Sequence, residues 1–146
     1  MDTPFLNVTV PVDGSETALR GVATAIASAR TGTALHFCNV VDIAVVGLGR
    51  GIGAPFDPLP IVEASEDDAR RVCAEAVALA EKNGVAADGK VLYGAVAPGI
   101  IRYAKELGSD TIVIGTHARH GISRLVFGSV AECVSAISDI PVVAVP

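Results

Sequence analysis

The sequence predicts one α/β domain with a five-stranded parallel sheet and helices on both of its faces. Three observations lead to this prediction. The 146 residues suit a single domain better than two. Strand-like and helix-like segments alternate strictly along the chain, and such alternation is typical of parallel sheets. Strands such as 111–114 and 141–145 are apolar without alternation, as expected where helices cover both faces.

The first strand is expected at 7–12, where β-branched residues dominate, and it ends at the turn cluster Asp13-Gly14-Ser15. A helix is expected over 16–30, because apolar residues recur there at helical spacing and Gly32 follows as a stop. The second strand is expected at 34–41. Strand, turn and helix therefore follow one another directly at the beginning of the chain.

A mobile loop is expected at about 43–64, because this segment is rich in Gly and Pro. Within it, Gly47 to Gly53 resembles a dinucleotide fingerprint only superficially, since its spacing is wrong. Ser65 to Asp68 has the spacing of a capping box, which predicts the start of a helix that ends near Gly84.

The second half repeats the strand and helix pattern, with Gly108 as a helix stop and Pro98 in a first helical turn. Because ligands of doubly wound sheets lie beyond the carboxyl ends of the strands, Asp13, Asp42 and Gly115 are in favourable places. The expected elements are a strand around 90–93, a helix over 98–107, a strand at 111–114, a helix over about 125–137 and a strand at 141–145.

Composition argues against a nucleic-acid partner. The formal net charge is -5, and no dense run of Lys and Arg is present. Aromatic residues amount to 4% of the chain, so platforms for stacking exposed bases are scarce. We therefore expect no binding to nucleic acid.

The sequence also bears on location and on cysteine chemistry. Residues 1–15 lack the features of a secretory signal, and no stretch is apolar over the roughly 20 residues that a membrane helix needs. We expect a cytoplasmic protein that does not engage a membrane. The cysteines Cys38, Cys73 and Cys133 form no CxxC pair, which favours core thiols.

The segment from Gly115 to Ser129 leaves an apolar strand and enters a helix, a geometry that suits an anion. A glycine at the strand exit allows backbone N–H groups to approach a phosphate, and a helix start favours negative charge. Arg119 and Arg124 add positive charge. The alternative is that the glycines serve close packing of strand against helix.

This segment resembles the signature of the universal stress protein family, which is Gly, two residues, Gly, nine residues, Gly, then Ser or Thr. Here the four positions are Gly115, Ala118, Gly128 and Ser129. An early strand before Asp13 and a terminal apolar strand match in order, so the resemblance covers essentially the whole chain. It implies a Rossmann-like fold of the adenine nucleotide alpha hydrolase type, frequent homodimers and, in one branch, ATP binding.

The resemblance also implies roles for individual residues. Asp13 would face the ribose or a divalent cation such as Mg or Mn, and the backbone of Val40 would bind adenine. The departure is Ala118, whose methyl group removes free access to positive φ beside the phosphates and so bears on ATP binding. The predicted nucleotide-binding residues are Pro11, Val12, Asp13, Val40, Gly115, His117, Arg119, Gly128, Ser129 and Val130.

Other polar residues have alternatives of their own. Asp13 precedes Gly-Ser and could instead cap the first helix. His117 and His120 lie three apart in a loop, but no Cys or carboxylate nearby in sequence completes a metal site. His36 lies on an expected strand and is interpreted as a half-buried structural residue.

Three functions compete. The first is a regulatory stress-response protein that binds ATP or a related adenine nucleotide without a strong catalytic activity. The second is a slow ATP hydrolase that uses Asp13 with a cation and His117 or Arg119. The third is a homodimeric interaction module without nucleotide, which pairs through the strand at 141–145 if that strand lies at a sheet edge.

Overall fold

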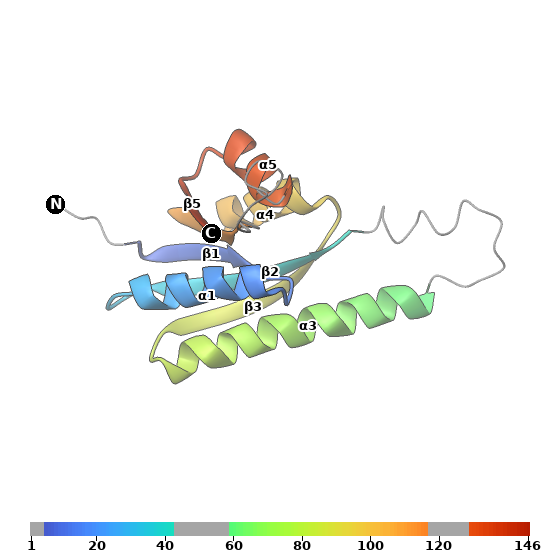
Figure 1. The fold of residues 1–146 in the computed structure, drawn as a ribbon, viewed down its shortest axis with the longest axis horizontal. Helices are drawn as coiled ribbons and strands as arrows, with labels where there is room; N and C mark the ends of the chain where they lie inside the picture. The colour runs from blue at the N-terminus through green and yellow to red at the C-terminus, as the bar shows by residue number, and fades with distance from the viewer. Residues whose placement is uncertain (1–4, 43–58, 117–128) are drawn as a thin grey trace.

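The computed structural model describes residues 5–42, 59–116 and 129–146. Its strands form one parallel sheet in the order β3-β2-β1-β4-β5 (Figure 1). This arrangement confirms the predicted fold class, and it puts β5 at one edge of the sheet and β3 at the other. The strands are β1 Asn7–Pro11, β2 Ala34–Val41, β3 Ala86–Tyr93, β4 Thr111–Gly115 and β5 Val142–Val145.

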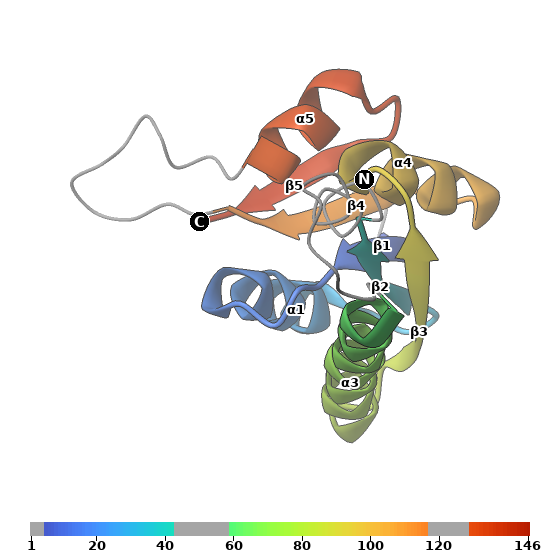
Figure 2. The ribbon, with the colours of Figure 1, turned by 90° about the vertical axis from the view of Figure 1, so that its right-hand side faces the viewer.

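The helices cover the sheet in two layers, α1 with α3 on one face and α4 with α5 on the other (Figure 2). Alternate residues of the central strands supply the two cores, because successive side chains of a strand point to opposite faces. Phe37 packs in the α1 and α3 layer, and the neighbouring Cys38 packs in the α4 and α5 layer. The helices are α1 Glu16–Ser28, α3 Leu59–Lys82, α4 Val96–Glu106 and α5 Ser129–Ile137.

Helix α1 begins where its sequence predicts and ends two residues earlier than predicted. The Ser15 hydroxyl accepts a hydrogen bond from the Ala18 N–H at 3.1 Å, which caps the helix. Gly32 has a φ of 91°, a backbone conformation that glycine adopts readily. The last turn ends at Ser28 rather than at residue 30.

The predicted start of the next helix is wrong. Helix α3 begins at Leu59, so residues 59–64 are helical and not part of a loop, while 43–58 lie outside the described residues. Pro60 falls where a backbone N–H has no intrahelical partner, and it therefore does not interrupt the helix. The acids of the expected capping box lie inside α3, where Asp67 and Asp68 pair with Arg70 and Arg71 three residues on.

Two other boundaries differ from the prediction. Strand β3 begins at Ala86 rather than near residue 90, because Ala86 to Gly89 pair with β2 although their β-propensity is low. Helix α4 begins two residues before Pro98. The described part of α5 begins at Ser129, and the earlier residues expected in that helix lie outside the described ranges.

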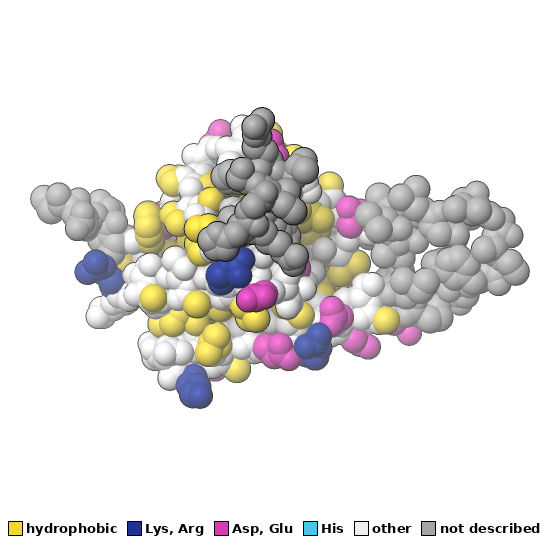
Figure 3. Space-filling view, viewed as in Figure 1, with side chains coloured by type: hydrophobic (Ala, Val, Ile, Leu, Met, Phe, Trp, Pro, Cys, Tyr) yellow, Lys and Arg dark blue, Asp and Glu magenta, His cyan; other side chains and the backbone are white. Residues whose placement is uncertain are grey.

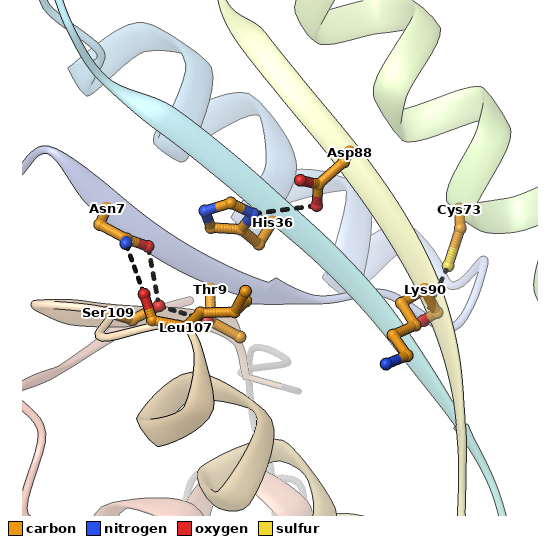
Figure 4. A network of polar contacts seen from close by, with 8 residues as sticks. All are labelled: Asn7, Thr9, His36, Cys73, Asp88, Lys90, Leu107 and Ser109. Carbon is orange, nitrogen blue, oxygen red and sulfur yellow. Dashed lines mark hydrogen bonds and ion pairs between the residues drawn. The ribbon is translucent and has the colours of Figure 1, made fainter.

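Polar contacts tie β1 to its neighbours at the end of the sheet opposite the site described below (Figure 4). The hydroxyl groups of Thr9 and Ser109 lie 2.7 Å apart, and the Ser109 hydroxyl donates to Asn7 Oδ1 at 3.1 Å. His36 is half-buried as predicted, and its Nδ1 lies 2.9 Å from an oxygen of Asp88. These contacts serve the fold.

The surface over α1 and α3 mixes charged side chains with isolated apolar ones (Figure 3). Leu19 and Leu79 are exposed there. Cys38 and Cys73 are buried as expected, but Cys133 is exposed on α5, which corrects the prediction of three core thiols. In the described parts of the chain, no helix has the length and apolar character needed to cross a membrane.

Candidate functional site

A cavity of about 300 Å³ lies at the carboxyl ends of β1, β2 and β4. The chain runs from β1 outward to β2 and β3 on one side, and β4 and β5 lie on the other. The cavity is therefore at the point where the strand order reverses, the usual ligand position in doubly wound sheets.

The cavity brings together the predicted site residues that the structure describes. They come from segments far apart in the sequence, namely the end of β1, the end of β2, the end of β4 and the start of the described part of α5. His117, Arg119 and Gly128 lie outside the described residues, as do Ala118 and His120. The predicted residues that line the cavity are Pro11, Val12, Asp13, Val40, Gly115, Ser129 and Val130.

Other lining residues were missed by the sequence analysis. Ser15 belongs to the turn cluster that the sequence does mark, and Asn39 precedes Val40 directly. Val96 and Ile100 carry no signal of their own, because only the packing of α4 on β2 brings them to the cavity. The missed residues are Ser15, Thr17, Ala18, Cys38, Asn39, Val96, Ile100, Ile114 and Ala131.

Two helix N-termini converge on the cavity. Ser15 and Thr17 contribute from the cap and first turn of α1, and Ser129 to Ala131 contribute from the first turn of α5. The first N–H groups of a helix have no intrahelical partner and carry the positive end of the helix dipole. At α1 the Ser15 and Ala18 N–H groups already donate to Asp13 Oδ1 and to the Ser15 hydroxyl, so this helix contributes mainly its dipole. Backbone donors for an anion would come from the first described turn of α5.

The remaining walls are mostly apolar. Val40, Val96, Ile100 and Ile114 line them from β2, α4 and β4, and Ile100 is almost completely buried. Burial raises the pKa of the Cys38 thiol well above its ordinary range, so this side chain is a neutral group in the wall. Apolar walls next to convergent polar groups are typical of small-molecule sites.

Asp13 has a structural role and a place in the cavity wall. Its Oδ1 accepts a hydrogen bond from the Ser15 N–H at 2.9 Å, which closes the turn before α1. Ser15, and not Asp13, caps the helix itself. The prediction that Asp13 caps the helix is therefore wrong, and its exposed carboxylate lines the cavity.

Gly115 packs very closely against the first turn of α1. A Cβ atom at this position would lie 2.1 Å from the carbonyl oxygen of Thr17. Across the same contact, a Cβ at Gly21 would lie 3.0 Å from the backbone nitrogen of Gly115. The packing alternative for this glycine is thus supported, and the close contact is also what brings Thr17 to the cavity.

A metal could use the carboxylate of Asp13 together with oxygen atoms of a bound ligand, since hard cations such as Mg²⁺ prefer oxygen. The described residues contain no group of three or more His, Cys, Asp and Glu side chains that could hold a metal by itself.

Comparison with known proteins is decisive for the family. The model of the universal stress protein family matches residues 4–146. The chain belongs to this family. The stress response protein NhaX of Bacillus subtilis is 31% identical over 159 residues, which cover 94% of this chain and 96% of the relative.

Solved structures of the family have the same fold. A universal stress protein family member from Burkholderia pseudomallei superposes with a TM-score of 0.78 at 29% identity, covering 100% of this chain and 99% of that one. The universal stress protein from Archaeoglobus fulgidus in complex with dAMP superposes with a TM-score of 0.70 at 24% identity, covering 99% and 100%. The second of these proteins thus holds an adenine nucleotide.

Proposed function

We propose that this chain is a stress-response protein that binds an adenine nucleotide in the cavity between β1 and β4. The observation that carries the proposal is the convergence of the α1 and α5 N-termini on a partly apolar cavity at the point of strand reversal. Membership in the universal stress protein family supports it, as does the dAMP bound by the Archaeoglobus fulgidus protein.

The base would occupy the apolar part of the cavity. The backbone of Val40 would hydrogen-bond the adenine edge, while Ile100 and Ile114 would contact its faces. A purine is planar and apolar on both faces, so aliphatic walls remove it from water at little cost. The backbone contact then distinguishes one base edge from another.

The phosphate would lie between the two helix N-termini. Ser129 and Val130 would offer backbone N–H groups from α5, and Ser129 would add its hydroxyl. The exit of β4 at Gly115 brings the backbone to the same place, and His117, Arg119 and Gly128 follow it in the sequence. Asp13 would contact the ribose or a Mg or Mn ion carried by the nucleotide.

Binding rather than catalysis is the activity that the described residues favour. Asp13 is the one carboxylate among the described lining residues, and none of these residues is Lys, Arg or His. A general acid and base pair would need at least two such groups within reach of the ligand. The nucleotide would then act as a conformational ligand.

Isothermal titration of the full chain with AMP, ADP and ATP, with and without magnesium, tests the proposal. Saturable binding of at least one of them is expected, at one site per chain. Absence of heat up to millimolar nucleotide under both conditions would reject it. Mass spectrometry of small molecules released from protein purified without added nucleotide gives an independent answer.

A homodimer through β5 is a second part of the proposal. Strand β5 is at the sheet edge, and its sequence Val-Val-Ala-Val lacks the charged side chains that protect free edges. The opposite edge strand, β3, carries Asp88 and Lys90. A second copy is therefore expected to pair at β5.

A further inference from the structure

Arg20 is placed beside the cavity without being part of its wall. It lies in the second turn of α1, and its side chain points back along the helix, as long helical side chains do. Nη2 donates to the Thr17 hydroxyl at 3.2 Å, and Nε donates to the Pro146 carbonyl at 3.1 Å. Thr17 lines the cavity, so the guanidinium is one hydrogen bond away from it.

The neighbours of Arg20 lie where the predicted phosphate segment begins. Thr17 touches Gly115 at the end of β4, and the next residue, Thr116, donates its backbone N–H to Val145 at 2.7 Å. Pro146 follows Val145 directly. The guanidinium is thus fixed between the first turn of α1 and the end of β5, next to the strand exit that leads into the signature segment.

The present contacts of Arg20 leave N–H donors available for a further acceptor. A guanidinium has five N–H donors, and two of them make hydrogen bonds here, one to the Thr17 hydroxyl and one to a main-chain oxygen of Pro146. The carboxylate of Glu16 lies 3.8 Å away and is 92% exposed, a geometry that contributes little free energy. The Arg20 side chain is itself 39% exposed. A phosphate oxygen is a stronger acceptor than the neutral hydroxyl of Thr17.

A phosphorylated ligand favours a cation beside the cavity, in addition to Arg119 and Arg124, which lie outside the described residues. The described lining residues of the cavity include the carboxylate of Asp13 and no Lys or Arg. A nucleoside monophosphate brings a further charge of about −1.5 to −2 at neutral pH. Helix N-termini supply only partial charges, so a full positive charge beside the cavity would offset the repulsion between Asp13 and the phosphate.

We propose that Arg20 is a specificity-determining residue that makes the affinity of the cavity depend on the phosphate charge of its ligand. Its guanidinium turns from Glu16 toward the phosphate while Thr17 and Pro146 hold it in place. The inference rests on the proposed nucleotide site and adds to it a preference for phosphorylated ligands over the nucleoside.

The test compares adenosine with AMP by isothermal titration on the wild-type chain and on Arg20→Gln. AMP affinity is expected to fall about tenfold or more in Arg20→Gln, since one charge-assisted hydrogen bond is lost. Adenosine affinity should stay within about twofold, because the base and sugar contacts remain. Arg20→Lys should recover part of the AMP affinity, since it keeps the charge without the planar fork.

Arg30→Gln is the matched control, because it removes the same charge from an exposed position just after α1. It should bind both ligands like the wild type. In the wild-type chain, rising salt concentration should weaken the binding of AMP more than the binding of adenosine. This measurement tests the charge effect without any substitution.

The outcomes are distinct. An unchanged ratio of AMP to adenosine affinity in Arg20→Gln would overturn the inference and leave the nucleotide site intact. An equal loss of affinity for both ligands would also overturn it, because the role of Arg20 would then be only to hold the end of β5. A wild-type chain that binds neither ligand would overturn the proposed function, and this inference with it.

Discussion

The Cα of Gly115 faces the carbonyl group of Thr17 so closely that a methyl group at position 115 would lie 2.1 Å from the Thr17 oxygen and 2.7 Å from its carbon. Both contacts are with backbone atoms of α1, which cannot move aside without moving the helix. This contact sets the distance between α1 and β4, and with it the width of the cavity.

Gly115→Ala should therefore destabilise the fold by about 3 kcal/mol, the upper part of the range for overpacking. Urea unfolding followed by circular dichroism measures the loss. Gly99→Ala is the matched control. Gly99 lies in α4, and a Cβ atom there would lie 3.7 Å from the Val40 side chain, which is an ordinary van der Waals contact. That variant should be neutral or more stable, because Ala is favoured over Gly in a helix. Equal effects at the two positions would contradict the close contact.

Two variants of Asp13 separate its two roles. Asp13→Ala should lose about 1 kcal/mol of unfolding free energy, because the bond to the Ser15 N–H is lost. Asp13→Asn keeps an oxygen acceptor and should retain most of that stability. If Asp13 also binds the ribose, Asp13→Ala loses nucleotide affinity, and if it binds a cation, Asp13→Asn loses affinity in magnesium as well. Wild-type affinity of both variants, measured with magnesium, would show that Asp13 serves the turn alone.

Thr111 and Thr9 are both completely buried threonines, but their hydroxyl groups differ in hydrogen bonding. Thr111 Oγ1 is the one buried side-chain N or O atom without a hydrogen-bond partner in the described parts of the chain. Thr111→Val should raise the unfolding free energy by about 1 kcal/mol, since it removes an unsatisfied hydroxyl at nearly constant shape.

Thr9→Val is the same substitution at a satisfied site. It should lower the unfolding free energy by about 1 kcal/mol, because the 2.7 Å contact with the Ser109 hydroxyl is lost. Denaturant midpoints of the two variants should thus move in opposite directions from the wild type. Destabilisation by both would mean that Thr111 has a partner.

The three cysteines should differ in reactivity. Burial raises the pKa of Cys73 to about 11 and raises that of Cys38 further, so both stay protonated at pH 9 in the folded chain. The thiolate is the reactive form. Iodoacetamide at pH 9 should label the exposed Cys133 first, as peptide mass spectrometry would show. Cys73 should begin to react only as the pH approaches 11. Rapid labelling of Cys38 at pH 9 would contradict its burial.

The predicted dimer is tested best at Ala144. Val143 packs against the core, so a charge there would disturb the fold itself. Ala144 is exposed, and Ala144→Lys adds the kind of charge that prevents edge pairing. Analytical ultracentrifugation should find a dimer for the wild type and a monomer for Ala144→Lys. If Ala144→Lys forms a dimer as stable as that of the wild type, β5 does not form the interface.

Much of the fold follows from the sequence alone. The alternation of strands and helices, the apolar strands and the stops at Gly32 and Gly108 depend on residues close together in the chain. Such local signals predict parallel topology and place the ends of strands at one side of the sheet. For that reason Asp13, Asp42 and Gly115 could be assigned to one edge of the sheet before any distance was known, whereas Val40 was assigned from the family resemblance.

The tertiary structure decided what local signals cannot. Helix α3 extends back to Leu59 although Ser65 resembles a cap, because acids within a helix can pair with Arg70 and Arg71 instead. Strand β3 extends over Ala86 to Gly89 because β2 pairs with it. Cys133 is exposed because it lies on the outer face of α5, which its sequence neighbours do not indicate.

The site shows the same division. The sequence determined the residues at the strand ends, since each follows a recognisable strand. The contribution of α4, the contact between Gly115 and Thr17, and the position of Arg20 between Thr17 and Pro146 arise only when helices pack on the sheet. They join residues about a hundred positions apart, and distances of that kind are fixed by packing and not by any local pattern.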